Sequence, residues 1–148
     1  MVRSKFVFCA LGLFFPGSGF NCLYLQGLKS YWGWLQLLAM LGGISGWLIL
    51  GSSEGNSFAG WFLLTLGFIS IEASLLTTIA YGLRNDARWD AEFNPQIDPQ
   101  KATRSSWPTV LLVIFSLVFG AGLMMSFFAI AFEQFFIYQL MEARKISQ

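Results

Sequence analysis

The stretch Phe14–Ile49, FFPGSGFNCLYLQGLKSYWGWLQLLAMLGGISGWLI, decides the fold of this chain. It is almost wholly apolar, but Pro16, Gly17 and Gly19 interrupt it early and Gly42-Gly43 interrupt it late. Proline lacks a backbone donor and glycine tolerates non-helical backbone angles, so the stretch cannot be one uniform helix. In lipid, the backbone groups freed at such a break must find partners within the protein. We therefore expect the early break to be buried, as either a kinked helix or a hairpin.

The composition is typical of a membrane protein. Hydrophobic residues make up 55% of the 148 residues and charged residues 11%, whereas an ordinary soluble domain has about 25% charged residues. The nine Lys and Arg residues nearly balance the eight Asp and Glu residues, which argues against nucleic acid as a partner. We expect membrane lipids and another protein to be the partners, with a homo-oligomer as a further option.

Metal and cofactor sites are not expected. The chain has no histidine, and its two cysteines, Cys9 and Cys22, both lie in the first apolar segment. Neither a zinc site nor a Cys-His catalytic pair can be built from these residues. The N-terminus resembles a signal peptide in its Arg3 and Lys5, but it continues into apolar sequence without a cleavage site, so we expect it to be retained.

Four apolar segments predict an all-α integral membrane protein, a small helical bundle in a single domain (1–148). The segments are Phe6–Gln26, which is broken at Pro16–Gly19, then Trp34–Leu50, Phe58–Leu83, and a fourth that begins at Ser106. The fourth is longer than one crossing needs, so residues 107–148 are expected to form a membrane helix with a C-terminal extension.

Glycines suggest where helices pack closely. Gly17 and Gly19 occupy the early break, and Gly42, Gly43 and Gly46 lie in the middle of the second segment. Gly42 and Gly46 form a GxxxG pattern, which allows two helix backbones to approach each other. The pattern fits packing within the chain better than packing against a partner.

Glu72 is the candidate intramembrane polar site. It lies near the middle of the third segment, with Ser70 and Ser74 expected on a face near it. Gln36 and Asn21 are further polar residues in apolar segments. A carboxylate at this depth costs a few kcal/mol and is a functional hypothesis by default. Glu72 either joins helices through hydrogen bonds to these groups or binds an ion, a proton or a partner.

Residues 84–106 form the main hydrophilic region, a loop with four basic and four acidic residues. Its first part can continue the third helix, while Pro95 and Pro99 end regular structure. The loop is either a surface for docking a protein partner or a solvated connector. The candidate docking residues are Arg84, Asp86, Arg88, Asp90 and Glu92.

The distribution of Lys and Arg favours one topology. If the first segment is a hairpin that does not cross, seven basic residues lie on the side of loop 84–106 and two, Arg144 and Lys145, lie opposite. If all four segments cross, the count is four against five and gives no orientation. We therefore prefer the hairpin, with loop 84–106 in the cytoplasm and the protein in the bacterial cytoplasmic membrane.

Residues from Leu11 to about Asn94 resemble the two-transmembrane-helix (TM-two) domain family. The matching stretches are GSGFNCLYLQ at 17–26, WLQLL at 34–38, and Gly42-Gly43. Asn21-Cys22 replaces the His-Arg pair of the family motif. Glu72 and the charged run that follows it are similar to the acidic residue and charged tail of the family. The resemblance implies architecture and membrane location rather than a particular activity.

No arrangement of residues in the sequence predicts an enzyme. Glu72 is the one acidic residue near the middle of an apolar segment, and no nucleophile-base pair, phosphate loop or metal cluster accompanies it. The favoured function is non-catalytic binding of another protein, and one specific form is an immunity or accessory protein for a membrane-directed partner or toxin. The alternative is a small ion or proton channel, or a transporter subunit, that uses Glu72.

Overall fold

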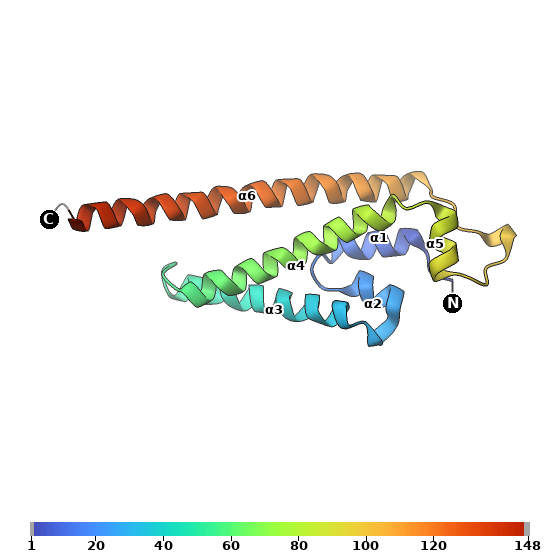
Figure 1. The fold of residues 1–148 in the computed structure, drawn as a ribbon, viewed down its shortest axis with the longest axis horizontal. Coiled ribbons are helices and arrows are strands. Elements are labelled where there is room, and N and C mark those ends of the chain that lie inside the picture. The colour runs from blue at the N-terminus through green and yellow to red at the C-terminus, as the bar shows by residue number, and fades with distance from the viewer. Residues whose placement is uncertain (1, 147–148) are drawn as a thin grey trace.

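The computed structural model describes residues 2–146, and over this range the chain is helical with no β-strand (Figure 1). The predicted all-α fold is therefore confirmed. The elements in chain order are α1 (Lys5–Phe14), α2 (Phe20–Gln26), the 3₁₀ turn η1 (Gly27–Lys29), α3 (Tyr31–Ser52), α4 (Phe58–Gly82), α5 (Asp86–Phe93), the 3₁₀ turn η2 (Pro99–Lys101) and α6 (Trp107–Ile146).

Three helices, α3, α4 and α6, are long and apolar enough to cross a membrane, with 22, 25 and 40 residues. The expected count of four segments is not supported, because the first segment divides into α1 with 10 residues and α2 with 7. At 1.5 Å per residue, α1 is about 15 Å long, half of the roughly 30 Å hydrocarbon core. Neither short helix can cross a bilayer by itself.

The chain reverses between α1 and α2 through backbone angles that favour glycine. Gly17 and Gly19 have φ values of 79° and 73°, in the left-handed region that other residues rarely adopt. Gly19 also lies against the backbone of α3, since an added Cβ would be 2.1 Å from the carbonyl oxygen of Gly33. The early break is thus a hairpin rather than a kinked helix.

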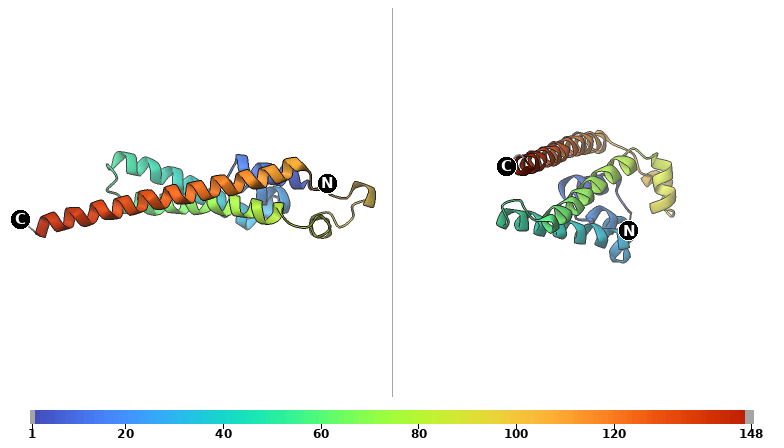
Figure 2. Two further views of the ribbon diagram at one scale, coloured as in Figure 1. Left: turned by 90° about the horizontal axis from the view of Figure 1, so that it is seen from above. Right: turned by 60° about the vertical axis from the view of Figure 1, so that its left-hand side comes forward.

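This reversal places the N-terminus and the loop at 84–106 at the same end of the molecule (Figure 1). The C-terminus and the turn between α3 and α4 lie at the opposite end, and a perpendicular view shows the same arrangement (Figure 2). The preferred count of seven basic residues against two assumes this arrangement, with the N-terminus and the loop at 84–106 at one end and Arg144 and Lys145 toward the other.

Glycines bring α3 and α4 into backbone contact. A Cβ on Gly43 would be 2.6 Å from Cα of Gly67, and a Cβ on Gly46 would be 2.7 Å from the carbonyl oxygen of Gly60. Gly42, the other member of the predicted pattern, meets only a Leu63 methyl group at 3.6 Å, an ordinary contact. The close face of α3 therefore carries Gly43 and Gly46.

Helix α6 packs on the bundle through its first part. Its buried residues are Thr109, Leu112, Val113, Ser116 and Gly120, which recur at the three- and four-residue spacing of one helix face. No residue of α6 after Gly120 is buried, although the rings of Phe127 and Phe68 stack at 4.1 Å. The predicted membrane helix and its extension form one continuous helix, which projects beyond the other helices (Figure 2).

We predict that Gly43→Ala destabilises the protein. The new Cβ would lie 2.6 Å from Cα of Gly67, and separating two packed backbones costs about 1–3 kcal/mol. Gly42→Ala is the matched control, because it makes the same change one residue away without a clash. Thermal unfolding in detergent should therefore show a lower midpoint for Gly43→Ala only. Equal midpoints for the two variants would contradict the α3–α4 contact.

Candidate functional site

Glu72 lies on the face of α4 that packs against α6. Its side chain is 6% exposed, and its Oε1 atom has no hydrogen-bond donor among the described residues 2–146. Its Oε2 atom lies beside Gly120 of α6, where an added Cβ would be 3.3 Å away. The missing side chain of Gly120 leaves room for the carboxyl group at the helix interface.

Ser70 lies on a different face of α4. Its Oγ atom is 3.0 Å from the carbonyl oxygen of Gly17 and 2.9 Å from that of Gln36. The hydroxyl can donate to either carbonyl, so it links α4 to the reversal after α1 and to α3. The hydroxyl thus provides a hydrogen-bond donor to a backbone carbonyl in the apolar interior. Backbone groups freed at a helix break in lipid need such a partner within the protein.

Asn21 and Ser74 meet each other in the same region. The amide nitrogen of Asn21 donates to Oγ of Ser74 at 3.4 Å, and both residues are buried. The side-chain oxygen of Asn21 accepts the backbone N–H of Cys22 at 2.9 Å. The Cys22 thiol in turn lies 3.7 Å from Oε1 of Gln36.

The structure thus does not bring the five predicted polar residues together. Asn21, Gln36, Ser70 and Ser74 lie among α2, α3 and α4, whereas Glu72 faces α6. Adjacent residues of an α-helix are rotated by about 100°, so Glu72, two positions from both serines, lies on nearly the opposite side of α4. The sequence predicted Ser70 and Ser74 on a face near Glu72. The structure instead places both serines on nearly the opposite side of α4 from Glu72.

Lys5 is the centre of a buried hydrogen-bond network that the sequence did not predict. The side chain is 3% exposed, and its ammonium group contacts the carbonyl oxygen of Arg84, Oδ1 of Asp86 at 2.9 Å and Oγ of Ser105 at 3.0 Å. These three acceptors match the three donors of an ammonium group. Lys5 therefore attaches the start of α1 to both ends of the loop at 84–106.

The residues before Lys5 reinforce this attachment. The backbone N–H of Arg3 donates to Asn94 at 2.7 Å, and its carbonyl accepts from the Trp89 indole and from Asn94 at 3.1 Å each. The backbone N–H of Ser4 donates to the Tyr24 hydroxyl at 2.8 Å. Helix α5 thus lies across the end of the bundle, where fully buried Trp89 packs against the Phe8 ring.

Two of the five predicted docking residues hold the loop itself. Asp86 accepts from Lys5 and from the backbone N–H of Ser105 at 2.7 Å. Asp90 accepts from the backbone N–H of Thr103 at 2.7 Å and from Asn94 at 3.0 Å. Both aspartate side chains therefore accept hydrogen bonds from other residues of this chain.

These contacts change the acidity of both aspartates. Burial raises the pKa of Asp86, but hydrogen bonds from Ser105 and Lys5 outweigh it, so the pKa lies below its ordinary value. Burial likewise raises the pKa of Asp90, and hydrogen bonds from Asn94 and Thr103 bring it below its ordinary value. Both groups are therefore held in the charged form.

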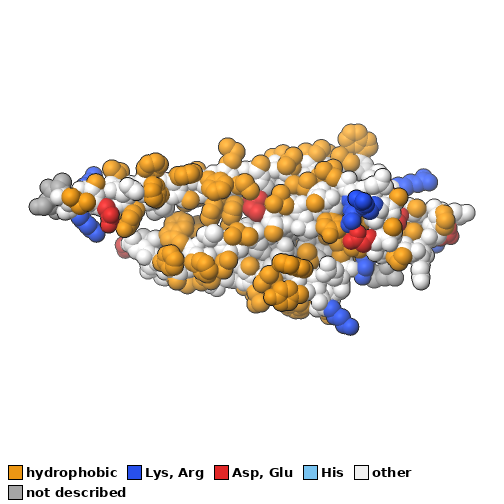
Figure 3. Space-filling model, viewed as in Figure 1, with side chains coloured by type: hydrophobic (Ala, Val, Ile, Leu, Met, Phe, Trp, Pro, Cys, Tyr) orange, Lys and Arg blue, Asp and Glu red, His pale blue; other side chains and the backbone are white. Residues whose placement is uncertain are grey.

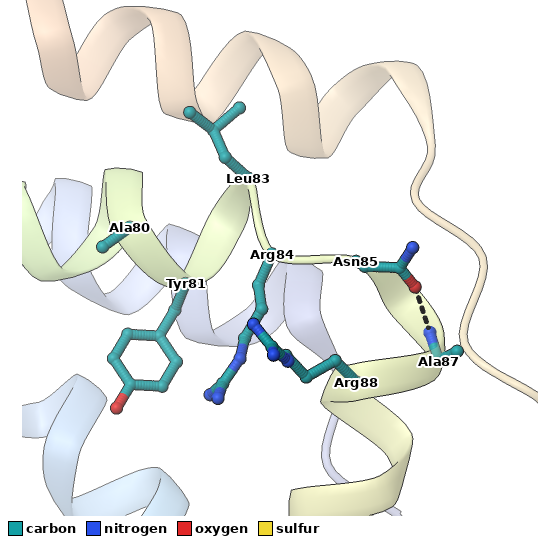
Figure 4. Close-up of a pocket in the computed structure, with 7 residues that line it drawn as sticks. All are labelled: Ala80, Tyr81, Leu83, Arg84, Asn85, Ala87 and Arg88. Atoms are coloured by element: carbon teal, nitrogen blue, oxygen red, sulfur yellow. Dashed lines mark hydrogen bonds between the residues drawn. The ribbon is translucent and has the colours of Figure 1, made fainter.

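Two of the other three predicted docking residues line an open pocket at the end of α4. Arg84 and Arg88 line it, together with Ala80, Tyr81, Leu83, Asn85 and Ala87 (Figure 4). Its volume is about 770 Å³. Glu92 pairs with Arg84 at 2.6 Å. On the face drawn in Figure 3, basic and acidic side chains gather at this end beyond a wide hydrophobic surface.

No protein-family model, curated protein or solved structure matches the chain. The resemblance to the TM-two domain family therefore stays a prediction from sequence. Among residues 2–146, no three His, Cys, Asp or Glu side chains cluster in a way that could hold a metal ion.

We predict that Asp86→Asn lowers the folding stability at pH 7 and makes the stability fall less steeply as the pH is lowered. The variant leaves the buried Lys5 ammonium without a counter-charge, at a cost of about 2 kcal/mol at pH 7, less than for a fully buried pair. The folded-state pKa of Asp86 lies below the unfolded value of about 3.9. The wild-type contribution is thus complete above about pH 5 and is lost as pH falls through 4 and below.

Thermal unfolding in detergent from pH 7 to pH 3 measures both effects. Asp98→Asn is the control, because Asp98 is exposed and only caps η2, where it accepts from the backbone N–H of Gln100. The Asp86 variant should have a lower midpoint at pH 7 and a flatter decline in acid. Identical curves for the two variants would show that the Lys5–Asp86 pair contributes nothing to stability.

Proposed function

We propose that the chain is an integral membrane protein without a catalytic role, which acts by binding another protein beside Glu72. Three apolar helices long enough to cross a bilayer support membrane insertion. The observation that carries the binding proposal is the buried Oε1 atom of Glu72, which has no donor among the described residues. An unsatisfied buried acceptor is costly, and a donor from a partner would remove that cost.

Two apolar grooves border helices α4 and α6, and Glu72 is buried between these helices without lining either groove. One, of about 670 Å³, lies among α1, α4 and α6 and includes Leu75 and Leu123. The other, of about 380 Å³, lies among α3, α4 and α6 and includes Ile71 and Leu123. A membrane helix in either groove would cover apolar surface and could offer an N–H or O–H group to Glu72. An immunity or accessory protein for a membrane-directed toxin is one form of this proposal.

The alternative function is an ion or proton channel or a transporter subunit. The same lone carboxyl group favours it, because intramembrane acids mark ion and proton paths. A path needs further polar groups, however, and Glu72 has no hydrogen bond to Asn21, Gln36, Ser70 or Ser74 among the contacts of the described residues. The geometry therefore supports partner binding better than transport.

We expect cross-linking to detect the partner beside Glu72. A photo-cross-linking residue at position 123, which lines both grooves, should give one discrete product in bacterial membranes. At position 38, on an exposed part of α3, it should not. Glu72→Gln should keep the product because its amide oxygen still accepts a hydrogen bond. Glu72→Leu should reduce the yield about tenfold, as expected for a lost buried hydrogen bond.

Glu133→Leu controls for the loss of one glutamate, since Glu133 is on the exposed part of α6. The same spread of products from positions 123 and 38 would contradict the proposal. A product that contains a second copy of this chain would identify the partner as a homo-oligomer. Proton flux into reconstituted vesicles that Glu72→Gln abolishes would instead favour transport.

We further propose that the loop at 84–106 faces the cytoplasm of a bacterial cell. Seven Lys and Arg residues belong to the end that carries this loop, and Arg144 and Lys145 belong to the other, and such an excess favours the cytoplasm. A peptide tag after position 148 should thus be digested by protease added to spheroplasts, while a tag within η2 should be protected. Protection of the C-terminal tag and digestion of the η2 tag would reverse the orientation.

A further inference from the structure

The pocket that Arg84 and Arg88 line has the features of a binding site for an anion. Both side chains extend from the backbone toward the side of the pocket where the Tyr81 ring lies (Figure 4). The Arg84 guanidinium is 5.2 Å from the centre of the Tyr81 ring. Arg88 is exposed and has no ion pair among the described residues. Two guanidinium groups can hold a phosphate through several charge-assisted hydrogen bonds.

The pocket lies at the depth of lipid headgroups if α3, α4 and α6 cross a bilayer, so this inference rests on the proposed membrane insertion. At the same end, Tyr31 and Trp32 begin α3 and Trp107 begins α6, all highly exposed. Exposed Trp and Tyr rings are typical of the boundary between hydrocarbon and headgroups. Arg84 follows the last turn of α4 and thus lies just beyond this boundary.

An apolar strip leads from the pocket along α4 toward the middle of the proposed span. Leu83, Ala80 and Leu76 are exposed and lie three and four residues apart, so they share one helix face. Ala80 and Leu83 also line the pocket. A ligand with a phosphate at the arginines and an acyl chain along this strip matches both surfaces.

The charge balance leaves room for one further anion. Glu92 pairs with Arg84 at 2.6 Å, but its side chain is 45% exposed, so solvent weakens the pair. Asp86, the other nearby acid, is bound to Lys5 and Ser105. The positive charge of Arg88 is therefore not matched by an acid within the pocket.

We propose that this pocket binds the phosphate of an anionic phospholipid through Arg84 and Arg88, with an acyl chain of that lipid against Leu76, Ala80 and Leu83. The lipid rather than a free anion is favoured because the apolar strip continues from the phosphate position into the hydrocarbon. Binding would fasten the end of α4 and the start of α5 to the headgroup layer.

Native mass spectrometry of the full chain in mild detergent tests the proposal with added phosphatidylglycerol or phosphatidylcholine. The wild type should retain phosphatidylglycerol more tightly. Arg88→Gln should weaken its retention about fivefold and Arg84→Gln with Arg88→Gln about 30-fold, from the usual contribution of one basic residue at an anionic lipid surface. Glu92→Gln should strengthen retention, because it removes the competing carboxylate.

The matched control combines Lys101→Gln with Arg104→Gln, which removes two positive charges from exposed sites at the same end, outside the pocket. An equal loss in this control, or wild-type retention in Arg88→Gln, would overturn the proposal. Arg88→Gln is decisive if the double variant misfolds, since Arg88 is exposed. Displacement of the lipid by millimolar inorganic phosphate would overturn the lipid assignment in favour of a free anion.

Membrane insertion is measured separately, as the fraction of each variant that stays in membranes after an alkaline wash. Wild-type protein released by this wash would refute the proposed membrane function, whatever the outcome of the lipid titration. Firm insertion of all variants, together with equal retention of both lipids by the wild type, would refute the phosphate site alone.

Discussion

Burial of the Lys5 ammonium is the constraint on which the arrangement of the chain depends. A buried ammonium needs acceptors for all of its donors, and these come from Arg84, Asp86 and Ser105. The start of α1 is therefore held at the end that carries the loop at 84–106. Because α3 also begins at that end, the chain between them must return, and it does so through the positive φ angles of Gly17 and Gly19.

Helix α4 is the centre of the molecule because different faces of it meet different neighbours. Gly67 allows α3 to approach its backbone, Ser70 and Ser74 face the reversal, and Glu72 faces α6. Small and hydroxyl-bearing residues suit such close contacts, since they add little volume and satisfy backbone or side-chain groups in an apolar interior. Among the described residues, the one buried side-chain oxygen or nitrogen of this helix without a hydrogen bond is the Oε1 atom of Glu72.

The two proposed sites differ in depth and in chemical character. Glu72 lies within an apolar helix interface, where a neutral or positive donor would stabilise it. Arg84 and Arg88 lie beyond the last turn of α4, where a phosphate group would meet both basic side chains and exposed apolar surface. Asp86 and Asp90 hold the loop that carries these arginines through hydrogen bonds from Ser105 and Thr103, so the segment that forms the basic pocket is fixed within the chain.

The sequence alone determined the helical class, the three long apolar helices and the early break, because composition, segment length and the backbone preferences of proline and glycine are local properties. Only the tertiary structure decided that Gly43 rather than Gly42 meets α4, that Glu72 faces α6 away from Ser70 and Ser74, and that Asp86 binds Lys5. The first two depend on the rotation of each helix about its axis. The third joins residues 81 positions apart, and no local pattern specifies such a pairing.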